Sequence, residues 1–172
     1  MKFTAIDFET ADTGADSACA VGLVRVEDGK VVAREHRLIR PPRPWILYTH
    51  IHGIAWKHVA SQPGFGKTWD ALRDLCEGVD FLAAHNASFD KRVLAACTAG
   101  TGHRMPSAPF VCTVQVARKT WNVRPTKLPD VARHLGLKLK HHEALSDAQA
   151  CADIVLAAAL DGWTSPASVL SR

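Results

Sequence analysis

The feature that most constrains this chain is a pair of acids, Asp7 and Glu9, set into an apolar segment near the amino terminus. Residues 3–8 read FTAIDF and predict a short buried strand. Residues i and i+2 of a strand point to the same face, so both carboxylates project together. Like charges on a buried face are unfavourable unless a cation neutralises them. The pair indicates either a cation site within a sheet or a solvated strand end.

Hydrophobic periodicity places the other elements around this strand. An Asp28-Gly29 hairpin signal joins two further strand candidates, and the prolines at 41, 42 and 44 open an irregular stretch. Strands are predicted at 3–8, 20–26, 31–39, 81–84 and 110–112, and helices at 69–76, directly after 84, at 114–121, 128–135 and 144–160, with Gly136 closing the fourth. This order predicts an α/β fold with a five-stranded mixed sheet, an antiparallel meander first and parallel strands afterwards.

Composition narrows the class of protein. A chain of 172 residues with 47% hydrophobic and 22% charged residues is typical of one globular domain, which we expect to span 1–172. No apolar run approaches the roughly 18 residues of a membrane span, and Asp7 and Glu9 interrupt any secretory signal, so we expect a cytoplasmic protein without a membrane partner. Five scattered cysteines without a Cys-x-x-Cys pair argue against disulfides and zinc. The net charge of +4 is compatible with a polyanionic partner.

A second acidic signal lies in residues 85–90, which read HNASFD. The segment follows a predicted strand directly and opens a helix, so Asp90 falls in the first helical turn. An acid there is a candidate metal ligand, and it is also favoured by the helix dipole alone. Asn86 is equally open to two interpretations, as a substrate contact or as the residue that caps the helix.

A third signal lies in residues 142–147, which read HEALSD. Five residues of a helix turn about 500°, so His142 and Asp147 cannot share a face within one regular helix. We therefore expect His142 in the loop that enters the helix and Asp147 inside it, where the two can converge. Ser146 is a competing helix cap, which leaves the helix start uncertain by a residue.

The three signals together supply four carboxylates and one histidine. Carboxylates from a strand and two helices are the oxygen ligands that a pair of Mg²⁺ or Mn²⁺ ions prefers. A paired-metal site about 4 Å across activates water and stabilises the leaving oxygen in phosphoryl displacement. A histidine with a pKa near neutrality can accept the proton of the water.

These segments carry a family resemblance. The sequence resembles the DEDDh 3′–5′ exonucleases, the family of bacterial proofreading subunits and their stand-alone relatives, through FTAIDFETA, HIHGI (50–54), AHNASFD, FVCTVQVAR (110–118) and HHEALSDA (141–148). The resemblance spans residues 3 to about 160. It implies a ribonuclease H-like fold with helices on both faces of the sheet, two divalent metal ions, and release of 5′-nucleoside monophosphates. It assigns Asp7, Glu9, Asp90 and Asp147 as metal ligands and His142 as the general base.

Three comparisons with branches of this family refine the resemblance. The sister branch carries a tyrosine four residues before the last aspartate, where this chain has Glu143. Proofreading subunits usually have an acid before the glycine of the second strand, where this chain has Val21 before Gly22. The chain also ends about 12 residues after the last predicted helix. We therefore expect a stand-alone enzyme that does not require a polymerase partner.

The resemblance also implies substrate contacts. Thr10 and Ala11 follow the first motif and are expected to line the pocket of the terminal nucleotide. Ile51 and His52 resemble the element that closes over this nucleotide, and Phe89 is expected to support it from the other side. Ile51 and Phe89 are equally compatible with an ordinary core position. With Asn86, these are the candidate substrate-binding residues.

The sequence leaves the nucleic acid open. Residues 118–140 hold seven basic groups and one acid, which predicts either a rim that follows phosphates or a solvated basic face. We expect single-stranded or frayed 3′ ends of DNA as substrate, and 3′ ends of RNA as the alternative, because no residue can be assigned to the 2′-hydroxyl. A non-catalytic nucleic-acid-binding module would be expected to lack a carboxylate or the histidine, and a ribonuclease H-type endonuclease is disfavoured by the His142–Asp147 spacing.

Overall fold

The computed structural model describes residues 1–165, so the last seven residues of the expected domain lie outside the description. A five-stranded sheet forms the centre, with β1 (Lys2–Thr10), β2 (Ala18–Glu27), β3 (Lys30–Leu38), β4 (Phe81–Ala84) and β5 (Phe110–Cys112) in the order β3-β2-β1-β4-β5. The β1–β2 and β2–β3 pairs are antiparallel, and the β1–β4 and β4–β5 pairs are parallel. The predicted meander followed by parallel strands is confirmed.

The hairpin between β2 and β3 forms where the Asp-Gly signal predicted it. Asp28 and Gly29 both have positive φ, 49° and 77°, which is the backbone that a tight two-residue hairpin turn requires. This hairpin aligns β2 with β1 over the length of both strands, so that Asp7 of β1 lies opposite Gly22 of β2.

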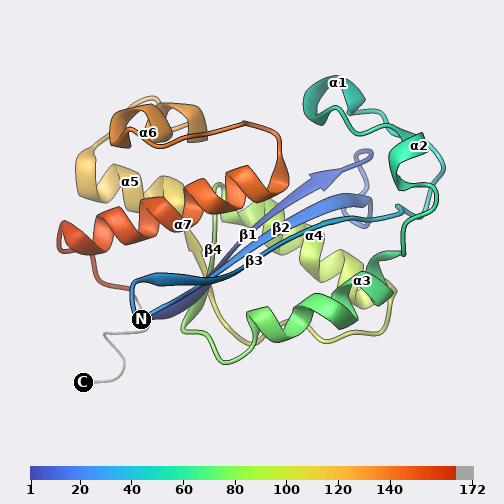
Figure 1. The fold of residues 1–172 in the computed structure, drawn as a ribbon, viewed down its shortest axis with the longest axis horizontal. Helices are drawn as coiled ribbons and strands as arrows, with labels where there is room; N and C mark the ends of the chain where they lie inside the picture. The colour runs from blue at the N-terminus through green and yellow to red at the C-terminus, as the bar shows by residue number, and fades with distance from the viewer. Residues whose placement is uncertain (166–172) are drawn as a thin grey trace.

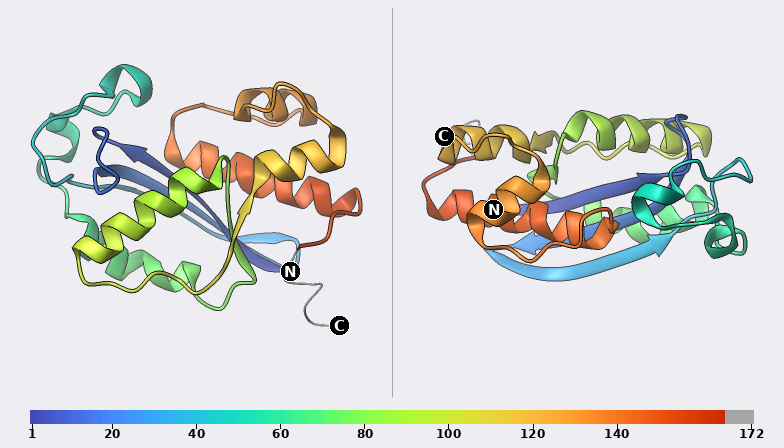
Figure 2. Two further views of the ribbon diagram at one scale, coloured as in Figure 1. Left: turned by 180° about the vertical axis from the view of Figure 1, so that it is seen from behind. Right: turned by 90° about the horizontal axis from the view of Figure 1, so that it is seen from above.

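Helices cover both faces of the sheet, as the resemblance implied. One face packs against α5 (Thr113–Trp121), α6 (Leu128–Leu135) and α7 (Ala144–Leu160) through Phe3, Ala5 and their neighbours. The other face packs against α3 (Phe65–Leu72) and α4 (Ala87–Gly100) through Ile6 and Phe8. Seen from behind, α4 crosses in front of the sheet and α3 lies below it (Figure 2). Because side chains alternate along a strand, Asp7 points to the same face as Phe3 and Ala5, toward α7.

The first turn of α7 packs against a glycine of β2. A Cβ at Gly22 would overlap the carbonyl group of Ala144 and lie 2.5 Å from the backbone nitrogen of Leu145. Only a residue without a side chain therefore allows the first turn of α7 to approach β2 this closely. Since Gly22 is the partner of Asp7, this contact brings the first turn of α7 to the position of Asp7 on the sheet.

The stretch after β3 is the part that the sequence did not resolve. It contains two four-residue helices, α1 (Thr49–His52) and α2 (Trp56–Val59), and α1 lies beyond the carboxyl end of β1 (Figure 1). The helix predicted at 69–76 begins earlier, at Phe65, and ends in a 3₁₀ turn, η1 (Arg73–Cys76). The helices at 128–135 and 144–160 have the predicted bounds, and Gly136 ends α6 with a left-handed backbone. Within residues 1–165, the helices are too short or too polar to cross a lipid bilayer.

Candidate active site

Three of the predicted carboxylates meet where β1 ends and α7 begins. One carboxylate oxygen from each of Asp7, Glu9 and Asp147 lies within 4.8 Å of the others. Asp7 and Glu9 reach this point because strand alternation puts them on the face of the sheet that α7 covers. Asp147 reaches it because the first turn of α7 packs directly against Gly22 of β2. The structure thus joins residues 140 positions apart into one acidic cluster.

Asp90 joins the same electrostatic group from the other side of β1. It lies in the first turn of α4 and is almost fully buried. One of its carboxylate oxygens, Oδ1, accepts a hydrogen bond of 3.0 Å from the backbone N–H of Phe8, between Asp7 and Glu9. Repulsion from the Asp90 carboxylate contributes to the raised pKa of Asp7.

The four acids are held in surroundings that disfavour their negative charge. Burial, followed by repulsion from Asp90, Asp147 and Glu9, raises the pKa of Asp7 well above its usual value. Burial and the charge of Asp147 raise the pKa of Glu9 to about 7, and burial raises the pKa of Asp90 to about 8. Burial also raises the pKa of Asp147. Clustered acids with raised pKa values are typical of a site that binds a positively charged group.

The two oxygens of Asp147 have different surroundings. Oδ2 accepts hydrogen bonds from His141 Nδ1, at 2.9 Å, and from the backbone N–H of His142, at 3.1 Å. Oδ1 is buried and has no hydrogen-bond partner among residues 1–165. A buried carboxylate oxygen without a partner is costly, so this atom fits a cation ligand. His142 precedes α7, as expected, and has a left-handed backbone with φ of 66°.

A cavity of about 310 Å³ opens on one side of the acidic cluster; we call it the small cavity. Four candidate substrate residues line it: Thr10, Ile51, His52 and Phe89. His142 lies in its wall, and so does Tyr48, the single tyrosine of the chain. Ile51 is 43% exposed, which argues against an ordinary core position for this side chain.

His52 connects the α1 segment to the end of β1. Its Nδ1 accepts a 3.1 Å hydrogen bond from the backbone N–H of Ile54. Its Nε2 lies 3.1 Å from the carbonyl oxygen of Thr10, and a carbonyl can only accept, so Nε2 carries the proton. Both ring nitrogens are thus engaged by backbone, and burial lowers the pKa of His52. The ring therefore holds the wall of the small cavity in place as a neutral group.

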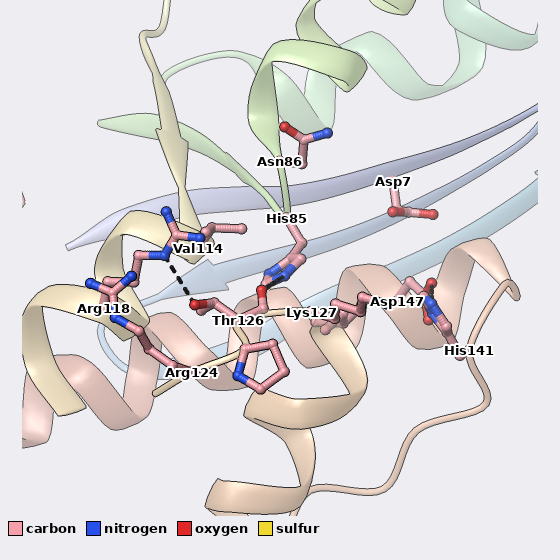
Figure 3. A pocket seen from close by; sticks show the side chains of 12 residues that line it. Asp7, His85, Asn86, Val114, Arg118, Arg124, Thr126, Lys127, His141 and Asp147 are labelled. Carbon is pink, nitrogen blue, oxygen red and sulfur yellow. Dashed lines mark hydrogen bonds and ion pairs between the residues drawn. The ribbon is translucent and has the colours of Figure 1, made fainter. Parts of the chain in front are cut away.

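A second cavity of about 570 Å³, the large cavity, opens on the other side of the cluster. It shares Asp7, His141 and Asp147 with the small cavity. Figure 3 shows these three residues at one end and Arg118 and Arg124 at the other, with His85 and Thr126 between them. The two cavities therefore meet at the acids.

Two of the expected substrate residues lie elsewhere. Ala11 is fully buried and does not line the small cavity, and its backbone bonds to Ser17 and Leu47. Asn86 lines the large cavity, in the position that caps α4, with a left-handed backbone and without a side-chain capping bond. The sequence reasoning also missed His141, which contacts Asp147 and lines both cavities; the only signal was its place beside His142.

This donor set fits hard divalent cations. Clustered carboxylate oxygens, one of them buried without a partner among residues 1–165, match the ligands that Mg²⁺ and Mn²⁺ prefer. The structure can therefore concentrate positive charge at the junction of two cavities, beside the imidazole of His142. Such a junction is suited to hydrolysis of a phosphate ester.

Comparison with known proteins agrees with this geometry. A model of the RNase_T exonuclease family matches residues 4–155. PolC-type DNA polymerase III of Thermotoga petrophila is 29% identical over 158 residues, which is 90% of this chain and 12% of that protein. Exodeoxyribonuclease 10 of Escherichia coli K12 is 31% identical over 156 residues, which is 84% of this chain and 64% of that protein. The chain thus spans about an eighth of the polymerases and less than two thirds of exodeoxyribonuclease 10.

Solved structures share the architecture. Exonuclease X, in a complex with 5′-overhanging duplex DNA, has a TM-score of 0.75 and 27% identity, and 94% of each chain is covered. The nuclease domain of 3′hExo, described as a DEDDh family member bound to rAMP, has a TM-score of 0.79 at 16% identity, covering 94% of this chain and 92% of that one; this likeness shows the ribonuclease H-like fold. Family match, fold and acidic cluster agree, and the chain belongs to the DEDDh exonuclease family, whose members depend on divalent metal ions.

Proposed function

We propose that this protein is a 3′→5′ exonuclease that removes 5′-nucleoside monophosphates from DNA with two divalent cations, Mg²⁺ or Mn²⁺. The observation that carries the proposal is the carboxylate cluster of Asp7, Glu9 and Asp147 at the junction of two cavities, with one buried oxygen that has no partner in the part of the chain that the structure describes. Together with Asp90, these residues would hold the cations. A pair of such ions supplies an activated water and charge stabilisation for the leaving oxygen.

His142 is the general base in this proposal. Its side chain lines the small cavity beside the carboxylates, and its backbone N–H is bound to Asp147. Burial and the neighbouring His141 lower the pKa of His142, so the imidazole is neutral at physiological pH and can accept a proton from water. His141 donates to Asp147 and orients its carboxylate, which makes His141 a positioning residue.

The shape of the small cavity supports removal of one nucleotide at a time. Its 310 Å³ accommodates a single nucleoside, with Ile51 and Phe89 as apolar walls for the base and Thr10 as a polar contact. A paired end must be unstacked to enter such a cavity, at a cost of a few kcal/mol per base. We therefore expect single strands and frayed 3′ ends to be degraded faster than paired ends.

DNA is the proposed substrate because exonuclease X, with 27% identity, was solved with DNA and exodeoxyribonuclease 10 carries deoxyribonuclease activity in its name. An exoribonuclease is the alternative within the same family. A non-catalytic binding module is disfavoured, since all four carboxylates and His142 are present.

Labelled strands test the proposal. Purified protein is incubated with 3′-labelled and 5′-labelled single-stranded DNA and RNA of the same sequence, with Mg²⁺, Mn²⁺ or EDTA, and products are resolved by length. We expect immediate release of the 3′ label as a mononucleotide and a ladder of shortened 5′-labelled DNA, both abolished by EDTA. Faster degradation of RNA would favour the alternative substrate, and 5′ label released first as a mononucleotide would reverse the polarity.

A further inference from the structure

The large cavity carries positive charge that the proposed chemistry does not use. Arg118, Arg124 and Lys127 line it, and we call these three residues the basic wall. None of the ion pairs formed within residues 1–165 involves the basic wall. All three residues are exposed; Arg118 and Arg124 lie at the end of the cavity away from Asp7 and Asp147, and Lys127 lies between the two ends (Figure 3). Cations without anionic partners in a cavity are available for an anionic ligand.

The basic wall is held in position by a relay of hydrogen bonds from the sheet. His85 follows β4 directly, and its Nε2 donates to the carbonyl oxygen of Thr126 at 2.9 Å. The other ring nitrogen of His85, Nδ1, lies 2.8 Å from the hydroxyl of Thr113 at the start of α5. These two contacts fix the loop between α5 and α6, which carries Arg124 and Lys127, to the carboxyl end of the strand beside β1.

The same threonine orients the third cation. Thr126 Oγ1 accepts a hydrogen bond of 3.0 Å from Arg118 Nε and donates one of 2.8 Å to the carbonyl oxygen of Val123. Because this bond uses Nε, the two terminal nitrogens of the guanidinium are left available for another ligand. A guanidinium whose orientation is already fixed loses less side-chain freedom when it binds a phosphate.

We propose that the basic wall is a phosphate subsite for the strand that leads to the 3′ end. This inference rests on the proposed function and adds a path: the strand lies in the large cavity, crosses the acids at the shared residues Asp7, His141 and Asp147, and ends in the small cavity. The small cavity has apolar walls suited to one base, whereas the large one has the charge suited to backbone phosphates. The ligand is thus an oligonucleotide, and the enzyme distinguishes it from a mononucleotide ester by the basic wall.

Equilibrium binding tests the subsite separately from catalysis. The probe is a fluorescent single-stranded DNA with non-cleavable phosphorothioate linkages, titrated at several KCl concentrations with wild type and with Arg124→Gln/Lys127→Gln. Affinity is expected to fall about tenfold for each charge-assisted hydrogen bond to phosphate that the substitutions remove. The slope of log affinity against log salt is expected to become shallower by about 0.7 for each cation removed.

A matched control has the same loss of charge elsewhere. Arg133→Gln/Lys138→Gln removes one arginine and one lysine that do not line the large cavity, and it should retain the affinity and the slope of wild type. Arg124→Lys keeps a positive charge and should keep the slope. Equal weakening by the control pair, or an unchanged slope in Arg124→Gln/Lys127→Gln, overturns the subsite.

Kinetics gives a second readout. The p-nitrophenyl ester of thymidine 5′-monophosphate has a single nucleotide and no upstream phosphate, so kcat/KM on DNA should fall about tenfold or more relative to kcat/KM on this ester in Arg124→Gln/Lys127→Gln. An equal loss on both substrates would mean that the loop merely supports the active site. Wild type that binds the strand with a steep salt slope but cuts neither substrate would refute the proposed function and leave the subsite supported by its binding data.

Discussion

In the absence of divalent cations, the free energy of unfolding should decrease as pH rises. Salt-bridged acids usually have the opposite effect. The pKa values of Asp7, Glu9, Asp90 and Asp147 are all raised in the folded chain. A carboxyl group whose folded pKa exceeds its unfolded pKa contributes its full stability at pH values below the unfolded pKa. That contribution is lost as pH rises through the folded pKa, because the folded state must then carry a buried charge.

The structure gives the size and the pH range of this effect. The pKa of Glu9 rises from 4.5 to about 7, and each pKa unit corresponds to about 1.4 kcal/mol, so this one residue accounts for about 3 kcal/mol. The pKa of Asp90 rises from 3.8 to about 8, so its own contribution is lost up to about pH 8. Because the acids share their protons, we expect a total loss of several kcal/mol between about pH 4 and pH 8 rather than the sum of separate shifts.

Urea unfolding followed by circular dichroism measures the free energy of unfolding at each pH. We expect it to fall from pH 5 to pH 8 in EDTA, and to recover at pH 8 when Mg²⁺ or Mn²⁺ is added, since an ion that binds only the folded state stabilises it. Asp7→Asn is the matched variant: it removes one buried charge at nearly constant shape. It should lose nearly all nuclease activity, yet be more stable than wild type in EDTA at pH 8.

Two results would refute the reasoning. The first is a free energy of unfolding in EDTA that stays constant or rises between pH 5 and pH 8, since the acids would then not repel one another in the folded chain. The second is an Asp7→Asn variant that cuts DNA at the wild-type rate, since the assignment of a cation site to this cluster would then be wrong.

Three further predictions concern the general base, the contact of α7 with Gly22, and the need for a free 3′ end. His142→Ala should lose about 10²–10⁴-fold in turnover and the rising limb of the pH–rate profile while the stabilisation by cations remains; an unchanged profile would move the base elsewhere. Gly22→Ala should displace α7 by about 1 Å, costing about 1–3 kcal/mol in unfolding experiments and about 10²-fold in activity, whereas Gly100→Ala, with open space at its Cβ, should leave both unchanged. A circular single strand should survive prolonged incubation, and its cleavage would indicate an endonuclease.

The sequence predicted the sheet and the long helices because their signals are local. Apolar runs with an Asp-Gly turn determine β2 and β3, and an apolar stripe with a glycine stop determines α6. The segment between β3 and α3 had no comparable signal. Its helices α1 and α2 have four residues each, too few for periodicity, and α1 is positioned by contacts of His52 with Thr10 and Ile54 that depend on the tertiary fold.

The active site likewise contains features that the sequence predicted and features that it did not. Strand alternation was sufficient to place Asp7 and Glu9 on one face, and helix geometry was sufficient to put His142 before the helix that carries Asp147. His141 and His142 are adjacent, so the sequence could not distinguish their roles. The hydrogen bond from His141 to Asp147 is visible only in the three-dimensional structure. The packing of α7 against Gly22 could also be found only in the three-dimensional structure, because this contact joins residues more than 120 positions apart.

The distance in sequence between Asp7 and Asp147 has a consequence for how activity appears during synthesis. Translation delivers β1 early and α7 late, so a nascent chain that has folded its meander still lacks Asp147 and the two histidines. The cation-binding centre can be completed only after α7 has docked, so we expect a nascent chain that lacks α7 to have no nuclease activity. Long-range closure of this kind makes folding slower, and it also delays hydrolysis until the fold is complete.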